Sequence, residues 1–194
     1  MIRILHTADW HIDAPLREFT DLQRRELRAS LLEIPGAIAE LCLRERCDLV
    51  LLSGDIFDGP CTREGYEAVY RALERMAVPV FVSPGSRDPY RAGSPWADEV
   101  WPENVYLFKY PEVTAFTIRE LDCRVYGAAF TGSRSGPLLT DFRATCSERH
   151  ALLVVHGDPT DPESPRNPVT AAQLRETGVD YAALGGIHTP GRFE

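Results

Sequence analysis

Residues 48–58 read DLVLLSGDIFD, and this stretch decides the fold that the sequence predicts. The apolar run Leu49–Ser53 is typical of a β-strand. It ends at Gly54, and the residues that follow include Asp55 and Asp58. Carboxylates are common metal ligands in proteins, so this segment predicts a strand with a metal-binding loop at its carboxyl end.

Four other apolar runs end in the same way. Residue types that ligate metals or handle phosphate follow Ile2–His6 (Asp9-Trp10-His11), Val80–Ser83 (Pro84-Gly85-Ser86-Arg87-Asp88), Leu152–Val155 (His156-Gly157-Asp158) and Tyr181–Leu184 (Gly185-Gly186-Ile187-His188). In open α/β sheets, ligands bind beyond the carboxyl ends of the strands. We therefore expect these five loops to meet at one metal-binding crevice.

The segments between the first runs predict helices. Asp21 to Arg46 has helical spacing of its apolar residues, and Pro35-Gly36 interrupts it, which predicts one kinked helix or two short ones. A second helix is expected from about Thr62 to Met76. Strands and helices that alternate at this spacing are typical of a parallel sheet.

The middle of the chain predicts a second sheet. Val105–Phe108, Val113–Ile118 and Cys123–Phe130 are short, closely spaced and β-rich, so we expect antiparallel strands. A short helix is expected from about Asn167 to Gly178, because glycine is favoured just past helix C-termini. Two sheets with helices outside them would form a four-layer α/β/β/α sandwich.

Composition limits the class of protein. The 194 residues suffice for one α/β domain, and no apolar stretch reaches the length of a membrane span, which is about 18 residues or more. The polar start of the chain does not fit a signal peptide, which predicts a cytoplasmic location. Five cysteines without Cys-x-x-Cys spacing argue against a disulfide framework. The net charge of −8 argues against a self-sufficient nucleic-acid groove.

The five loop segments resemble the motifs of calcineurin-like metallophosphoesterases, and their wording is similar to the nuclease subunits of SbcCD-type DNA repair complexes. The segments read ILHTADWHID, DLVLLSGDIFD, PVFVSPGSRDPY, LLVVHGD and DYAALGGIHTP, in the family's order from residue 4 to residue 190. The resemblance implies a metallophosphoesterase sandwich of two mixed sheets. It also implies a single domain over residues 1–194 that lacks the family's C-terminal capping region.

The resemblance assigns metal ligands to particular positions. One metal of the family takes the residues that match Asp9, His11, Asp55 and His188. Two carboxylates and two imidazoles suit Mn²⁺, with Fe²⁺ or Zn²⁺ as alternatives. Asp9 and His11 can also face one ion from an extended segment, because residues two apart point the same way. We expect this first site to bind metal.

Three positions depart from the family pattern. The third motif has Ser86 and Arg87 where the family has an Asn and a proton-donating His, and the fifth has Gly186 where the family has a His. The second metal would then retain only His156 and the shared Asp55. We therefore expect one ion rather than two.

Arg87 offers a positive charge in place of the second ion. A guanidinium is a permanent cation with forked donors, so we expect its head near the second-metal position, paired with Asp55 or with a bound phosphate. Asp88 is expected either to orient Arg87 or to cap its loop. Asp58 is expected to cap a turn.

Three functions are compatible with the sequence. The first is a metal-dependent phosphodiesterase, by resemblance a DNA nuclease, with DNA or another phosphodiester as substrate and an SbcC-like ATPase as partner. The second is a catalytically inactive relative that serves as a binding or regulatory subunit. The third is a hydrolase of small phosphoesters. No membrane partner is expected.

Overall fold

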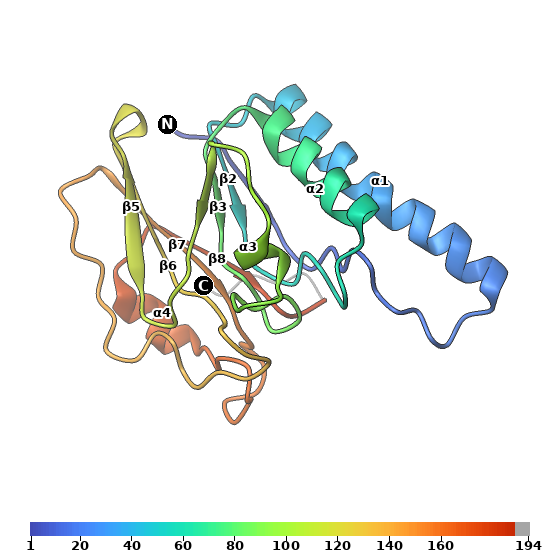
Figure 1. The fold of residues 1–194 in the computed structure, drawn as a ribbon. Helices are drawn as coiled ribbons and strands as arrows, with labels where there is room; N and C mark the ends of the chain where they lie inside the picture. The colour runs from blue at the N-terminus through green and yellow to red at the C-terminus, as the bar shows by residue number, and fades with distance from the viewer. Residues whose placement is uncertain (189–194) are drawn as a thin grey trace.

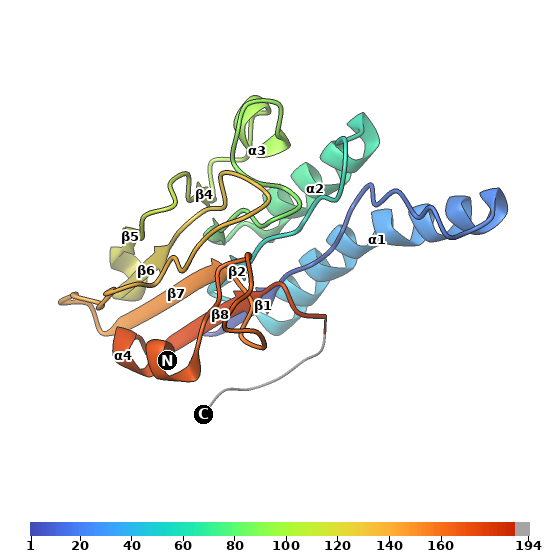
Figure 2. The ribbon, with the colours of Figure 1, turned by 90° about the horizontal axis from the view of Figure 1, so that it is seen from below.

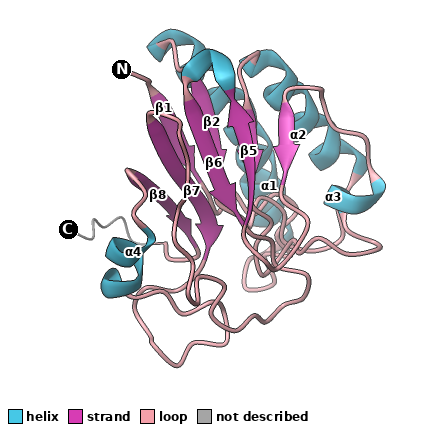
Figure 3. Ribbon diagram, turned by 90° about the vertical axis from the view of Figure 1, so that its left-hand side faces the viewer, coloured by secondary structure: helices cyan, strands magenta, loops and turns pink. Residues whose placement is uncertain are grey.

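Two four-stranded sheets lie face to face in the structure, a computed structural model that describes residues 1–188 (Figure 1). Long helices lie over the outer face of one sheet, whereas a short helix and loop segments lie against the outer face of the other (Figure 3). The last six residues of the predicted domain, 189–194, which include the end of the fifth motif, lie outside the described residues. The predicted α/β class with two sheets is confirmed.

The first sheet is parallel throughout. Its strands run in the order β1 (Ile4–Thr7), β2 (Leu49–Leu52), β3 (Val80–Val82) and β4 (Val105–Leu107). Helices α1 (Asp21–Glu45) and α2 (Arg63–Met76) lie side by side over its outer face (Figures 1 and 2). This sheet therefore consists of βαβ units, as the spacing of the sequence predicts.

The second sheet is mixed. Its strands run in the order β5 (Thr114–Ile118), β6 (Cys123–Gly127), β7 (His150–His156) and β8 (Tyr181–Gly185), and only β5 and β6 are antiparallel. The short helix α4 (Ala171–Thr177) packs on its outer face. Two shorter elements complete the described fold, namely α3 (Pro95–Asp98) and a 3₁₀ turn (Arg119–Leu121).

The predicted place of Val105–Phe108 in the second sheet is wrong. Residues Val105–Leu107 form β4, which pairs parallel with β3, so the first sheet is parallel rather than mixed. Asn104, just before β4, donates from its side-chain Nδ2 to the carbonyl oxygens of Leu73 at 3.0 Å and Val78 at 2.8 Å. These bonds hold the start of β4 beside β3.

Helix α1 corrects a second expectation. It is one helix that continues through Pro35, which is buried, so the alternative of two short helices is wrong. Its start is stabilised by a capping box, in which Thr20 accepts from the Gln23 N–H and the Gln23 side chain accepts from the Thr20 N–H.

The core explains why the strands form where they do. In β2, Leu49 and Leu51 pack between the two sheets, whereas Val50 and Leu52 pack against the helices, and all four are fully buried. Each such side chain contributes about 1.5–3 kcal/mol by leaving water. A strand buried on both faces is fixed in register, and this fixes where the loop at its carboxyl end begins.

Candidate metal centre

The loops after β1 and β2 remain paired beyond the strands. The N–H of Asp9 donates to Gly54 O at 3.0 Å, and the N–H of His11 donates to Asp55 O at 3.1 Å. Asp9, His11 and Asp55 all have positive φ, at 55°, 50° and 53°. Such a backbone costs about 1–3 kcal/mol per residue and is concentrated at functional sites. The packed surroundings thus hold these side chains in one arrangement.

Asp9, His11 and His188 form the first group of candidate ligands. Each offers one ligand atom, and these atoms lie within 4.8 Å of one another. Nε2 of His11 lies 3.1 Å from Nε2 of His188. Two nitrogens that each bind one ion at about 2.0–2.1 Å would lie roughly 2.9–3.4 Å apart for bond angles of about 90–110°. The donor set therefore fits a divalent metal ion.

Asp9 also belongs to a second group, with Asp55 and His156. His156 is 1% exposed, and its Nε2 lies 3.5 Å from an Asp55 carboxylate oxygen. Its Nδ1 lies 3.0 Å from the carbonyl oxygen of Ser53, which can only accept, so Nδ1 must carry the proton. The lone pair of Nε2 is thereby directed at the carboxylates.

The grouping differs from the one that the sequence predicts. Among residues 1–188, no group within 4.8 Å contains both Asp55 and His188. Asp9, rather than Asp55, is common to the two groups. The second group also has three members instead of the two expected, because Asp9 comes within reach of Asp55 and His156. That these residues ligate a metal stays a prediction.

Asp9 is bound from one side by the fifth loop. The Gly186 N–H lies 3.2 Å and 3.1 Å from the two carboxylate oxygens of Asp9. Burial nevertheless raises the pKa of the Asp9 carboxyl, and the nearby Asp55 carboxylate adds to the rise. A partly buried anion of this kind is stabilised by a cation placed beside it.

Arg87 does not pair with Asp55, the first of the two partners expected for its head. Its backbone N–H donates to Asp55 at 2.8 Å, but its half-exposed guanidinium faces Asp58, with 3.8 Å between Nη1 and Oδ1. The guanidinium thus faces Asp58 and not Asp55, and the other expected partner, a bound phosphate, stays a prediction. Ser86 lies on the same carboxylate, with its hydroxyl 3.4 Å from Asp55 Oδ2.

Asp88 caps its loop, the second of the two roles expected for it. It is 2% exposed and accepts five N–H groups. The donors are the backbone N–H groups of Asp55, Ile56, Phe57 and Gly85 and the indole N–H of Trp96. Burial raises the pKa of the Asp88 carboxyl, while these donors act in the opposite direction. Asp88 thus fixes the backbone that carries Asp55.

Sequence reasoning missed the role of Asp58. Its Oδ2 lies 3.0 Å from Nδ1 of His11, so it contacts a candidate ligand rather than only a turn. The available signal was its position in the second loop, three residues after Asp55. That spacing alone does not reveal the contact, because the contact depends on how the first two loops pair.

Gly186 occupies a backbone conformation that requires glycine. Its φ is +105°, and an added Cβ would lie 2.9 Å from Gly157 O and 3.2 Å from His156 Nε2. Gly186→Ala should lower the free energy of unfolding by about 1–3 kcal/mol, measured by urea denaturation. Gly136→Ala is the control, because a Cβ at Gly136 meets nothing within 4 Å. Equal stability of the two variants would contradict the strain at Gly186. A histidine at this position would suffer the same strain.

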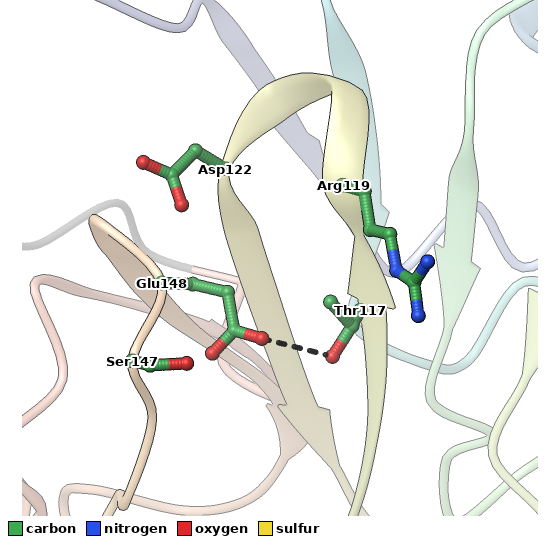
Figure 4. A pocket seen from close by; sticks show the side chains of 5 residues that line it. All are labelled: Thr117, Arg119, Asp122, Ser147 and Glu148. Carbon is green, nitrogen blue, oxygen red and sulfur yellow. Dashed lines mark hydrogen bonds between the residues drawn. The ribbon is translucent and has the colours of Figure 1, made fainter.

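A separate surface hollow lies on the second sheet, away from the carboxyl ends of β7 and β8 that carry the candidate ligands (Figure 4). It lies by the turn from β5 to β6, near the start of β7. Its lining residues are Thr117, Arg119, Asp122, Ser147 and Glu148. The Thr117 hydroxyl donates to Glu148 at 3.4 Å. None of these residues belongs to either ligand group found among residues 1–188, so the hollow is distinct from the candidate metal centre.

The chain belongs to the calcineurin-like phosphoesterase family, whose sequence profile matches residues 2–190. It is 26% identical over 203 residues to the uncharacterized metallophosphoesterase YhaO of Bacillus subtilis, a match that covers 96% of this chain and 48% of YhaO. It is 34% identical over 94 residues to a subunit of the nuclease SbcCD of Rhodobacter capsulatus, covering 45% of this chain and 22% of that protein. The chain thus spans about half the length of YhaO.

A solved structure shares the fold. The crystal structure of TT1561 of Thermus thermophilus aligns with a TM-score of 0.53 and 15% sequence identity, over 96% of this chain and 82% of that one. At this identity the likeness concerns the fold alone. Over the described part of the chain, no helix is long and apolar enough to cross a membrane.

Proposed function

We propose that this chain is a metal-dependent phosphodiesterase whose principal ion is held by Asp9, His11 and His188. The observation that carries the proposal is the 3.1 Å approach of the two imidazole Nε2 atoms beside Asp9. Mn²⁺ is the first choice for this mixed donor set, with Fe²⁺ or Zn²⁺ as alternatives. Such an ion supplies a Lewis acid for a phosphoryl oxygen and activates a water.

The second group is proposed to bind an ion more weakly. Asp55 already accepts the Arg87 N–H, and Gly186 adds no side chain where the family has a ligand. Titration of the metal-free protein with Mn²⁺ should therefore give one tight equivalent, measured by isothermal calorimetry and by elemental analysis after dialysis. Two equivalents of equal affinity would contradict this prediction.

Arg87 is proposed to bind the phosphate of the substrate. Its guanidinium is half exposed and lies as far as 3.8 Å from the carboxylate of Asp58, so it can exchange that carboxylate for a phosphate. It stays protonated and does not act as a general acid. Its role is then to stabilise negative charge on the phosphate.

Hydrolysis of a generic aryl phosphodiester with Mn²⁺ tests this role. Arg87→Ala should lower kcat/KM by about 10- to 100-fold, because a hydrogen bond to a charged group contributes about 1.5–3 kcal/mol. Arg91→Ala is the matched control, because Arg91 is an exposed arginine four residues along the same loop. Equal activity of both variants would rule out the proposed contact.

DNA is the proposed phosphodiester, and an SbcC-like ATPase the proposed partner. Support comes from the partial likeness to an SbcCD nuclease subunit. The net charge of −8 favours a partner that supplies part of the DNA-binding surface. Cleavage of DNA ends in preference to nucleotides would support the nuclease over a hydrolase of small phosphoesters.

The alternative function is a catalytically inactive relative that binds or regulates. Ser86 and Gly186 favour it, because they stand where the family has an amide and an imidazole ligand. In that case Mn²⁺ binds without hydrolysis of any phosphodiester. Measurement of activity on the wild-type protein, loaded with Mn²⁺, therefore separates the two functions.

A further inference from the structure

Asp58 uses both of its carboxylate oxygens within the candidate metal centre. Oδ2 lies 3.0 Å from Nδ1 of His11, and Oδ1 lies 3.8 Å from Nη1 of Arg87. The side chains of His11 and Asp58 are 19% and 21% exposed, so both are largely shielded from water. One carboxylate thus contacts a candidate metal ligand and the proposed phosphate-binding cation.

The backbone fixes Asp58 beside His11. The Asp58 N–H donates to Ile12 O at 2.8 Å, and Ile12 forms a parallel bridge with Phe57. Ile12 and Phe57 are both buried, at 0% and 1% exposure. His11 and Asp58 are the sequence neighbours of this buried pair, so the packing of the core fixes the backbone positions of both residues beside each other.

The contact sets which nitrogen of His11 carries the proton. An ionised carboxylate only accepts, so the hydrogen bond requires the proton on Nδ1. Nε2 then keeps its lone pair, and this is the atom that lies 3.1 Å from His188 Nε2. Histidine ligands of metals commonly have such a partner on the other ring nitrogen, which fixes the tautomer and the ring orientation.

We propose that Asp58 is a positioning residue that holds His11 in the tautomer required for metal binding and at the same time restrains the Arg87 head at the edge of the site. The inference rests on the proposed metal-dependent function, which it deepens. One carboxylate would then hold both His11, a candidate metal ligand, and Arg87, which stands where the family has a histidine.

Two substitutions separate the hydrogen bond from the charge. Asp58→Ala removes the acceptor for His11, whereas Asp58→Asn keeps an amide oxygen of similar size at that position. Glu103→Gln is the control for loss of one negative charge. Glu103 is exposed and precedes β4, so it lies at the amino ends of the parallel strands, away from the loops that carry the candidate ligands.

The first measurement does not depend on metal. Long-range ¹H–¹⁵N NMR spectra of the metal-free protein, at a pH well above the ordinary pKa of imidazole, report the proton position on each ring. His11 should carry its proton on Nδ1 in the wild type, in Asp58→Asn and in Glu103→Gln. A wild-type His11 ring with its proton on Nε2 would overturn the inference, whatever the protein does with metals.

The second measurement is the affinity for Mn²⁺ by calorimetry. Asp58→Ala should weaken binding by about 10- to 100-fold, the usual effect of losing such a partner, while Asp58→Asn recovers most of the affinity. Glu103→Gln should match the wild type. Wild-type affinity in Asp58→Ala would overturn the inference. Failure of the wild type itself to bind Mn²⁺ would instead contradict the proposed function and leave the NMR result to decide on Asp58.

Discussion

Asp9→Asn is expected to abolish tight Mn²⁺ binding, a larger loss than that of any other single ligand. Asp9 is the one residue shared by the two candidate ligand groups found among residues 1–188. Its replacement removes an anionic ligand from both, whereas His11→Ala affects only the first group. The affinity should fall by more than the roughly 10- to 100-fold typical of a residue that only supports a ligand.

Calorimetric titration with Mn²⁺ measures this effect, with Asp161→Asn as the control. Asp161 is an exposed aspartate on the loop after β7, and its carboxylate accepts the N–H of Glu163. This control should bind Mn²⁺ like the wild type. Wild-type affinity in Asp9→Asn would show that the metal is held elsewhere.

The same substitution should not weaken the metal-free protein. Burial raises the pKa of Asp9, so its ionised form is disfavoured in the folded state when no cation is beside it. An asparagine carries no charge, and its side-chain oxygen can still accept the Gly186 N–H. The free energy of unfolding without metal should therefore be equal or higher in Asp9→Asn, as urea denaturation would show. A clear loss of stability would contradict this account of the site.

The sequence predicts the approach of the loops better than their detailed contacts. Apolar runs that end in Asp and His place Asp9 and His11 just past the carboxyl end of β1, and His188 just past that of β8. These two strands belong to different sheets, so their ends are brought together by the face-to-face packing of the two sheets and not by pairing within one sheet. The grouping of Asp55 with Asp9 and His156 rather than with His188 does not follow from strand direction, and the assignment of Asp55 to a metal stays a prediction.

Side-chain direction is the part that the sequence does not determine. Arg87 has a long side chain, and its head faces Asp58, a partner that the order of the residues does not indicate. The partner of Asp58 is set by the pairing of two loops that are more than 40 residues apart in sequence. The sheet that contains Val105–Leu107 is mispredicted for a related reason, since short β-rich runs do not specify a partner strand.

Asp88→Asn is expected to destabilise the protein by about 2–6 kcal/mol, a large part of the roughly 5–15 kcal/mol typical of a whole domain. In the wild type, one oxygen of Asp88 accepts two N–H groups and the other accepts three. An asparagine must turn its NH₂ toward one of these sets. At least two buried donors then lose their acceptor, at about 1–3 kcal/mol each.

Asp158→Asn is the matched control for this prediction. Asp158 also accepts backbone N–H groups, from Thr160 and Asp161, but it lies on a more exposed loop, where water can replace the lost bonds. Its substitution should cost about 1 kcal/mol or less. Urea denaturation of both variants gives the comparison. Equal losses would mean that the five donors on Asp88 are satisfied in another way, and that the loop carrying Asp55 does not depend on it.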